Sequence, residues 1–191
     1  MTVLEIAADV AGRLDALGIP YAIGGSVASS TWGQMRQTND IDIAILLSPP
    51  RSSELLSAFD APYHLGSEEL VEALASEAEF RSVQVIQMEE AFKIDLFLLQ
   101  PGEYTDALLG RARTMEVLPG ERLRFYAAED IVLAKLRWFR LGNEVSDRQW
   151  NDIVNVVEVQ SGQLDGTYLA RWARHFGVEA NLNRALDQAA R

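Results

Sequence analysis

The chain has 191 residues, an apolar content of 48%, a formal net charge of −11 and no cysteine. This length suits one domain, or one domain with a helical extension. The lack of cysteine excludes disulfides, thiolate nucleophiles and cysteine zinc sites, and it fits the cytoplasm. The negative charge argues against a broad electrostatic grip on nucleic acid.

The first predicted element is an amphipathic helix over residues 4–17, ending at Gly18. It carries acids and lacks the basic start and apolar run of a signal peptide. No later apolar run is long enough to cross a membrane. We therefore expect a cytoplasmic protein without a membrane partner.

A short strand at 21–23 is followed by the turn Gly24-Gly25-Ser26 and a helix at 27–32. Glycine has no Cβ, so such a turn can bring bare backbone N–H groups close to a ligand. The N-terminus of the following helix also favours anions. The turn therefore predicts a cradle for phosphate.

Two aspartates open the next predicted strand, at 40–47. Asp40 and Asp42 are two residues apart, so both carboxylates point to the same side of a sheet. Hard oxygen ligands of this kind suit Mg²⁺. The alternative interpretation is a pair of residues that cap the start of the strand.

A third acid, Asp95, lies on an apolar strand in the second half of a hairpin predicted at 80–99. Three carboxylates that converge on a sheet edge can hold two Mg²⁺ ions on a triphosphate. In that arrangement Asp95 would be the general base or a ligand of the second ion. The substrate would be an NTP.

The rest of the chain divides at residue 126. The sequence predicts a mixed α/β (α+β) core over 1–126 and a helical region over 127–191 that packs on it. Further elements of the core are helices at 52–59, 67–78 and 104–109, a connection or edge strand at 62–66, and edge strands at 111–117 and 123–125. Ser67 is the predicted N-cap of its helix. The helical region should contain helices at 127–141, 147–160, 164–176 and 179–190.

The combination of Gly25-Ser26, Asp40-Ile41-Asp42 and a later Asp95 resembles the DNA polymerase beta-like nucleotidyltransferase superfamily. This resemblance implies a mixed, strongly twisted sheet flanked by helices. It also implies transfer of a nucleoside monophosphate from NTP with release of pyrophosphate. Asp40, Asp42 and Asp95 would then be both catalytic residues and metal ligands.

The helical half is similar to small bacterial nucleotidyltransferases of the abortive-infection toxin type, through the runs AAEDIVLAKLRWF and SDRQWNDIVNVV. The resemblance implies that Lys135 and Asp152 approach the active site, and it makes an antitoxin protein a candidate partner. Lys135 would contact phosphate, or else would be a lysine at a helix seam whose amine reaches solvent. Asp152 would orient Lys135 or pair with Arg148, four residues earlier on the same face.

The nucleotide would bind Gly24, Gly25 and Ser26, together with Lys135 and Arg36, the nearest base after the turn. Arg36 could equally cap its loop. The acceptor stays open between tRNA or another RNA, a protein, and a small cationic molecule. The basic run Arg137, Arg140 and Arg148 would suit a tRNA end.

Three competing functions remain. The first is an active nucleotidyltransferase, as one component of a toxin–antitoxin pair or alone. The second is a non-catalytic nucleotide-binding or interaction module on the same fold. The third is a phosphatase or nuclease that uses the same acids, in which the glycine turn would have no clear role.

Other distinctive residues have simpler interpretations. The acidic run from Glu54 to Glu90 is a solvated face or a surface for a cationic substrate. His64 and His175 are isolated, which argues against a zinc site. The tryptophans predicted to pack in the interior are Trp138, Trp150 and Trp172. Trp32 either packs as well or, because it closely follows the glycine turn, stacks on a nucleotide base.

Overall fold

The computed structural model describes residues 1–34 and 38–190. Its contacts divide the chain into two units. The sheet unit comprises Met1–Gly24 and Thr38–Phe125, and the helical unit comprises helix α2 (Gly25–Trp32) and the chain from Tyr126 onward. Helix α2 contacts helices α6 (Ala128–Leu141) and α7 (Asp147–Val159).

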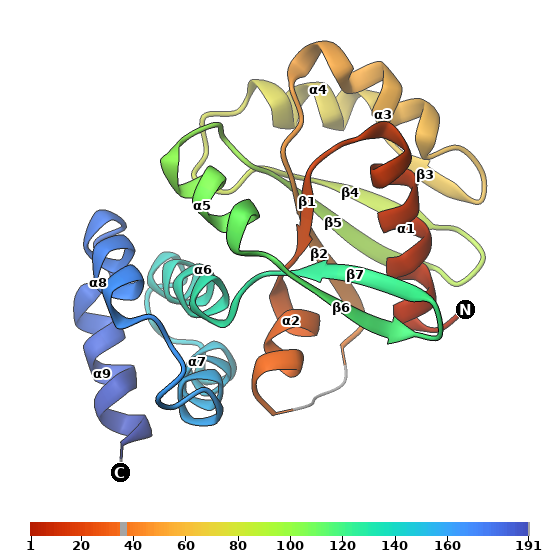
Figure 1. The fold of residues 1–191 in the computed structure, drawn as a ribbon. Coiled ribbons are helices and arrows are strands. Elements are labelled where there is room, and N and C mark those ends of the chain that lie inside the picture. Colours follow the sequence, from red (N-terminus) through yellow and green to blue (C-terminus); the bar gives the residue numbers. More distant parts are fainter. Residues whose placement is uncertain (35–37, 191) are drawn as a thin grey trace. The chain divides into compact units, whose positions relative to one another are not determined.

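Within the described residues, the sheet has seven strands in the order β3-β4-β5-β2-β1-β7-β6. In chain order the strands are β1 (Tyr21–Ile23), β2 (Asp40–Ile45), β3 (Tyr63–Leu65), β4 (Ser82–Gln87), β5 (Phe92–Leu98), β6 (Arg113–Leu118) and β7 (Glu121–Phe125). The pairs β2–β5 and β1–β7 are parallel, and the other neighbours are antiparallel (Figure 1). The predicted mixed sheet is confirmed.

The predicted hairpin at 80–99 is present as β4 and β5, and the predicted edge strand near 62–66 is β3. One prediction is wrong: the strand around 123–125 does not lie at an edge. It is β7, which pairs with β6 on one side and with β1 on the other. Sequence alternation gives a strand's faces but not its neighbours, because pairing with β1 is a long-range contact.

The two faces of β2 differ in polarity. Ile41, Ile43 and Ile45 are each 0% exposed, whereas Asp40 and Asp42 on the other face are only half-buried. Full burial of one such isoleucine contributes about 1.5–3 kcal/mol. The isoleucine face therefore belongs to the core, and the aspartates lie on the opposite face.

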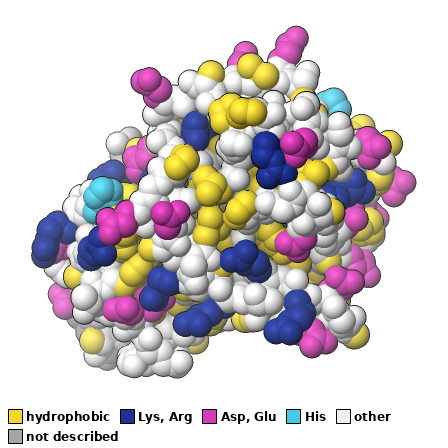
Figure 2. Space-filling model, turned by 45° about the horizontal axis from the view of Figure 1, so that its top comes forward, with side chains coloured by type: hydrophobic (Ala, Val, Ile, Leu, Met, Phe, Trp, Pro, Cys, Tyr) yellow, Lys and Arg dark blue, Asp and Glu magenta, His cyan; other side chains and the backbone are white. Residues whose placement is uncertain are grey.

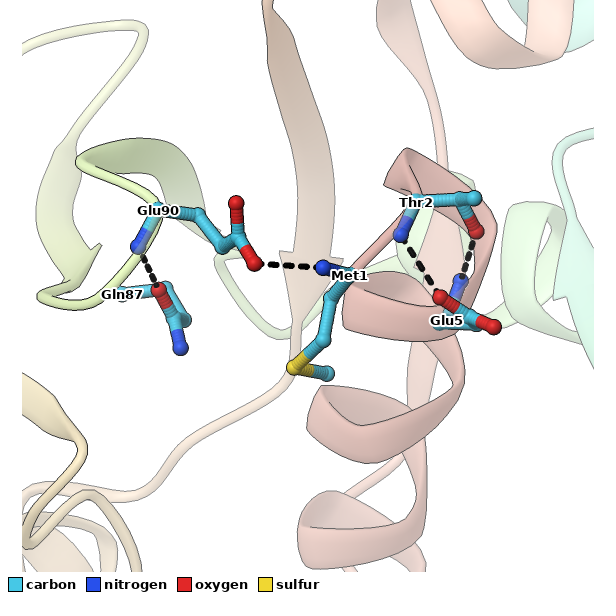
Figure 3. Close-up of polar contacts among 5 residues, drawn as sticks. All are labelled: Met1, Thr2, Glu5, Gln87 and Glu90. Carbon is cyan, nitrogen blue, oxygen red and sulfur yellow. Dashed lines mark hydrogen bonds and ion pairs between the residues drawn. The ribbon is translucent and has the colours of Figure 1, made fainter.

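Helix α1 (Val3–Leu17) packs against this sheet through β2, β6 and β7. A capping box fixes its start: Thr2 N–H donates to Glu5 at 2.7 Å, and Glu5 N–H donates to the Thr2 hydroxyl at 3.3 Å (Figure 3). The hydrogen bond from the Thr2 N–H, with a further contribution from the Thr2 side chain, lowers the pKa of the Glu5 carboxyl group. Gly18, at φ 62°, ends the helix as predicted.

The remaining helices of the sheet unit are α3 (Ser52–Ala58), preceded by the 3-10 turn η1 (Pro49–Arg51), α4 (Ser67–Ala75) and α5 (Glu103–Arg111). The N-cap prediction for α4 is wrong, because Gly66 occupies that position and Ser67 is already helical. Glu68 and Glu69 do lie in the first turn, where the helix dipole favours them.

The helical unit contains α2, α6 and α7, followed by α8 (Gly166–His175) and α9 (Glu179–Ala189). Trp150 and Trp172 are 7% and 4% exposed, as predicted for interior residues. The prediction for Trp138 is wrong, since this side chain is 38% exposed. At the end of α6, Leu136 and Phe139 form the buried stripe, and Trp138 falls outside it.

Buried polar contacts join α6 to α8 and its preceding residue. The Tyr168 hydroxyl donates to Asp130 at 2.7 Å, and the Asp165 N–H donates to Glu129 at 2.8 Å. Both acids lie in the first turn of α6, where the dipole stabilises negative charge. Across residues 1–34 and 38–190, no helix combines the length and apolar character that a bilayer crossing requires.

Candidate active site

The candidate site starts from a row of residues across neighbouring strands of the sheet unit. In the parallel β2–β5 pair, Asp42 stands directly opposite Asp95. Register partners point to the same face of a sheet, so the two carboxylates share one face. Asp40, two residues before Asp42, lies on that face as well and is opposite Lys93.

Neighbouring side chains hold the carboxylates of Asp40 and Asp95. Thr38 donates its hydroxyl to Asp40 Oδ1 at 2.6 Å. Gln84, on β4, donates its side-chain amide to Asp95 Oδ1 at 3.2 Å. Neither Thr38 nor Gln84 is among the residues that the sequence predicts for the site. The only local signal for Gln84 is its polar position in the alternating strand around residues 82–87.

Among the described residues, no group of three or more His, Cys, Asp or Glu side chains is arranged to hold a metal ion. The chemistry of the donors still fits Mg²⁺, which prefers one or two carboxylates together with substrate phosphates and water. The register supplies such a pair in Asp40 and Asp42, with Asp95 beside them. The backbone therefore assembles suitable donors without completing a three-ligand set.

The predicted glycine turn has a different form from the one expected. Helix α2 begins at Gly25, two residues earlier than predicted, so Gly25 and Ser26 lie in its first turn. Gly25 has φ 54°, a left-handed conformation that glycine adopts without a steric penalty. The first N–H groups of a helix lack intrahelical acceptors and can bind an anion.

Gly24 has another role in the sheet unit. Its N–H donates to the Asp42 carbonyl oxygen at 2.8 Å and extends the β1–β2 ladder past Ile23. This bond fixes the backbone of Asp42 and occupies the Gly24 amide. Arg36, the other predicted nucleotide contact near the turn, lies outside the described residues.

Lys135 and Asp152 form an ion pair between α6 and α7, with 2.8 Å between Nζ and Oδ2. Their side chains are 9% and 11% exposed. Of the two interpretations of Asp152, the structure shows the contact with Lys135. Lys135 thus has a charged partner within the helical unit, which the interpretation as a phosphate contact did not anticipate.

Two residues of the predicted basic run are used in packing. The Arg137 guanidinium lies 4.0 Å from the centre of the Phe176 ring, and Arg140 donates to the Phe176 carbonyl oxygen. Both contacts tie α6 to the end of α8. These arginines therefore contribute to the packing of the helical unit.

A cavity of about 370 Å³ lies in the helical unit, between the end of α7 and helices α8 and α9. Its lining is mainly apolar and includes Val157, Leu169, Leu182 and Leu186. None of the predicted site residues lines it. His175 packs edge-on against Trp172, with 5.3 Å between ring centres.

Acidic and basic side chains are interspersed on the face of the molecule in Figure 2. This face carries no large area of one sign of charge. The net charge of −11 is therefore not displayed there as one acidic surface.

The fold is that of nucleotidyltransferases, as the resemblance implied. The crystal structure of ANT(2'')-Ia in complex with adenylyl-2''-tobramycin has a TM-score of 0.61 at 13% identity, over 94% of this chain and 99% of that one. The solution structure of the antibiotic-resistance factor ANT(2'')-Ia has a TM-score of 0.58 at 13% identity, over 96% and 97%. An antigenic nucleotidyltransferase-like protein from Paracoccidioides brasiliensis has a TM-score of 0.54 at 17% identity, over 96% and 91%.

No protein-family model matches the sequence, and no curated protein matches it. At these identities the structural similarity shows the fold, so the reaction has to be argued from the residues of this chain.

Proposed function

We propose that this protein is a Mg²⁺-dependent nucleotidyltransferase, which moves a nucleoside monophosphate from an NTP to an acceptor hydroxyl. The register of Asp42 with Asp95, with Asp40 on the same face, is the observation that carries this proposal. Support also comes from the fold, which is shared with solved nucleotidyltransferase structures.

In this proposal Asp40 and Asp42 hold the metal ions against the triphosphate, and Asp95 completes the set or takes a proton. Bound Mg²⁺ would supply charge neutralisation on the phosphates and a lower pKa of the attacking hydroxyl. Gln84 already occupies Oδ1 of Asp95, which favours proton acceptance at the other oxygen.

Nucleotidyl transfer exchanges one bond at the α-phosphorus for another. The acceptor oxygen forms a bond to the α-phosphorus, and the bond from that phosphorus to the bridging oxygen breaks. Pyrophosphate leaves with the electron pair, and the hydroxyl proton passes to Asp95. The N–H groups at Gly25 and Ser26 would bind phosphate oxygens, with Arg36 as a further phosphate contact.

Lys135 fits less simply as a nucleotide contact. To reach phosphate it would have to exchange its ion pair with Asp152 for a new one. A lysine that is already paired and largely buried has a structural role that needs no ligand. A phosphate-binding role for Lys135 therefore stays a prediction.

For the acceptor we favour a small cationic molecule that carries a hydroxyl. The net charge of −11 favours cations over nucleic acid, and Arg137 and Arg140 are used in packing. The ANT(2'')-Ia complex contains an adenylylated tobramycin, a compound of this class. Transfer to RNA or protein, and pairing with an antitoxin, are the alternatives that the toxin-type resemblance implies.

The test is label transfer by the purified protein. Each of the four NTPs, labelled at the α-phosphate, is incubated with Mg²⁺ and an aminoglycoside panel, with total tRNA, or with a cell protein extract. We expect label on an aminoglycoside, loss of transfer with EDTA, and recovery with excess Mg²⁺. Asp42→Asn should lower transfer on the order of 10³-fold, whereas substitution of an exposed acid on α9, Asp187→Asn, should leave it unchanged.

The outcomes separate the hypotheses. Label on tRNA or on protein would keep the reaction and replace the acceptor. Nucleotide binding without transfer to any acceptor would favour the non-catalytic module. Release of free phosphate or of nucleotides from RNA, with no labelled product, would point to the phosphatase or nuclease alternative.

A further inference from the structure

The row that contains Asp42 and Asp95 continues onto a third strand. Strand β5 lies between β2 and β4, and in the antiparallel β4–β5 pair Gln84 stands directly opposite Asp95. Gln84 is therefore on the same face as the two aspartates. Its side-chain amide donates to Asp95 Oδ1 at 3.2 Å, from the side of β5 away from Asp42.

We propose that Gln84 is a positioning residue for nucleotidyl transfer. Its amide holds the carboxylate of Asp95 through Oδ1, so that Oδ2 has a fixed orientation for the reaction. This inference rests on the proposed function, because it assigns a task to Gln84 only if Asp95 takes part in transfer.

Two physical arguments support this role. A carboxylate on a single Cβ rotates over a broad torsional range, so an unheld Asp95 would present its oxygens in many orientations. In addition, like charges directly opposite on adjacent strands repel, so Asp42 favours orientations of the Asp95 carboxylate toward β4. The Gln84 amide on β4 meets the carboxylate on that side and restricts its rotation.

The neutrality of the amide matters. A lysine or arginine at position 84 would also hold Asp95. Its positive charge, however, would weaken the binding of a proton or a metal ion to the Asp95 carboxylate. Gln84 supplies a hydrogen bond without a counter-charge. The nearest cation in the register is Lys93, which stands opposite Asp40 in a different row.

A simpler explanation is that Gln84 and Asp95 only stabilise the hairpin, as cross-strand pairs do by roughly 0.2–1 kcal/mol. That role predicts a small change in stability and no specific change in turnover. A positioning role predicts a loss of kcat, an unchanged KM for NTP and an altered environment of the Asp95 carboxyl group.

The experiment uses two variants of similar length without the donor, Gln84→Met and Gln84→Glu. The control is Ser82→Ala, on the same strand and face but opposite Phe97. We expect kcat to fall about 10–100-fold in both Gln84 variants, as for other residues that orient a reacting group. KM for NTP should stay within about twofold, and Ser82→Ala should match the wild type.

A second readout does not depend on activity. The side-chain carboxyl signal of Asp95 in carbon-13 NMR, assigned by its loss in Asp95→Asn, should shift or broaden in Gln84→Met and not in Ser82→Ala. Wild-type kcat in Gln84→Met together with an unmoved Asp95 signal would overturn the inference. If the wild type transfers nothing, the proposed function fails, and an unmoved signal would show separately that Gln84 does not hold Asp95.

Discussion

Asp42 and Asp95 stand opposite each other on the parallel strands β2 and β5, half-buried and on one face of the sheet. Two like charges in such a position repel each other. Their mutual repulsion is therefore unfavourable for the folded state, and a bound cation would offset it. This relationship links the proposed reaction to a measurable cost in stability.

The first prediction separates activity from stability. Asp42→Asn and Asp95→Asn should each lower the rate of transfer on the order of 10³-fold. Catalytic groups that act as a unit lose most of their effect when any one of them is removed. In metal-free buffer Asp95→Asn should raise the free energy of unfolding by about 0.2–1 kcal/mol, through relief of its repulsion with Asp42. Urea denaturation and the label-transfer assay measure the two effects, with Asp187→Asn as the control. A loss of stability in Asp95→Asn would show that this carboxylate is structural.

The second prediction concerns the ion pair of Lys135 and Asp152. Lys135→Met leaves Asp152 without this counter-charge in a largely buried position and should cost about 3–5 kcal/mol. The double variant Lys135→Met/Asp152→Leu should recover most of that loss, because a well-packed apolar pair avoids the desolvation of two charges. Urea denaturation of the wild type, both single variants and the double variant gives the coupling energy. Additive losses would show that the two side chains do not depend on each other.

The third prediction is a stability change at alkaline pH. Burial, with a further contribution from Asp15, raises the pKa of Tyr21 to about 12. The folded state therefore binds the Tyr21 hydroxyl proton more tightly than the unfolded chain does, in which a tyrosine has a pKa of about 10. The resulting stabilisation is complete below pH 10 and is lost as the pH rises through 12.

Tyr21→Phe removes the titrating group. The free energy of unfolding of the wild type should then fall faster than that of the variant above pH 10, by on the order of 2 kcal/mol at pH 12. Urea denaturation between pH 8 and 12 measures both curves. Parallel curves over this range would contradict the assignment.

The fourth prediction contrasts two glycines. A Cβ at Gly33, at the end of α2, would lie 3.0 Å from the Ser29 carbonyl oxygen and 3.2 Å from Val156 of α7. Gly33→Ala should therefore cost about 1–3 kcal/mol, because the contact between the two helices is already close. Gly12, inside α1, has no atom within 4 Å of such a Cβ, so Gly12→Ala should stabilise by about 0.5–1 kcal/mol. Thermal unfolding of both variants gives the comparison, and a stabilising Gly33→Ala would show that α2 and α7 can separate at no cost.

Much of the fold follows from local patterns. Alternation in 40–47 identifies the apolar face of β2, and the helical period after residue 126 identifies α6 to α9. Such patterns depend on residues close in sequence, so they can be interpreted without the fold. They fail where burial depends on a distant partner, as for the exposed Trp138 and for the interior position of β7 in the sheet.

The sequence by itself determined the chemistry available: three aspartates on apolar strands and a glycine turn before a helix. Only the tertiary structure decided which groups meet. Strand order and register are set by long-range pairing, and these placed Asp95 beside Asp42 and Gln84 beside Asp95. Helix packing likewise decided that Lys135 faces Asp152. Side-chain periodicity gives the face on which a residue lies, whereas its neighbour across that face depends on where another part of the chain folds.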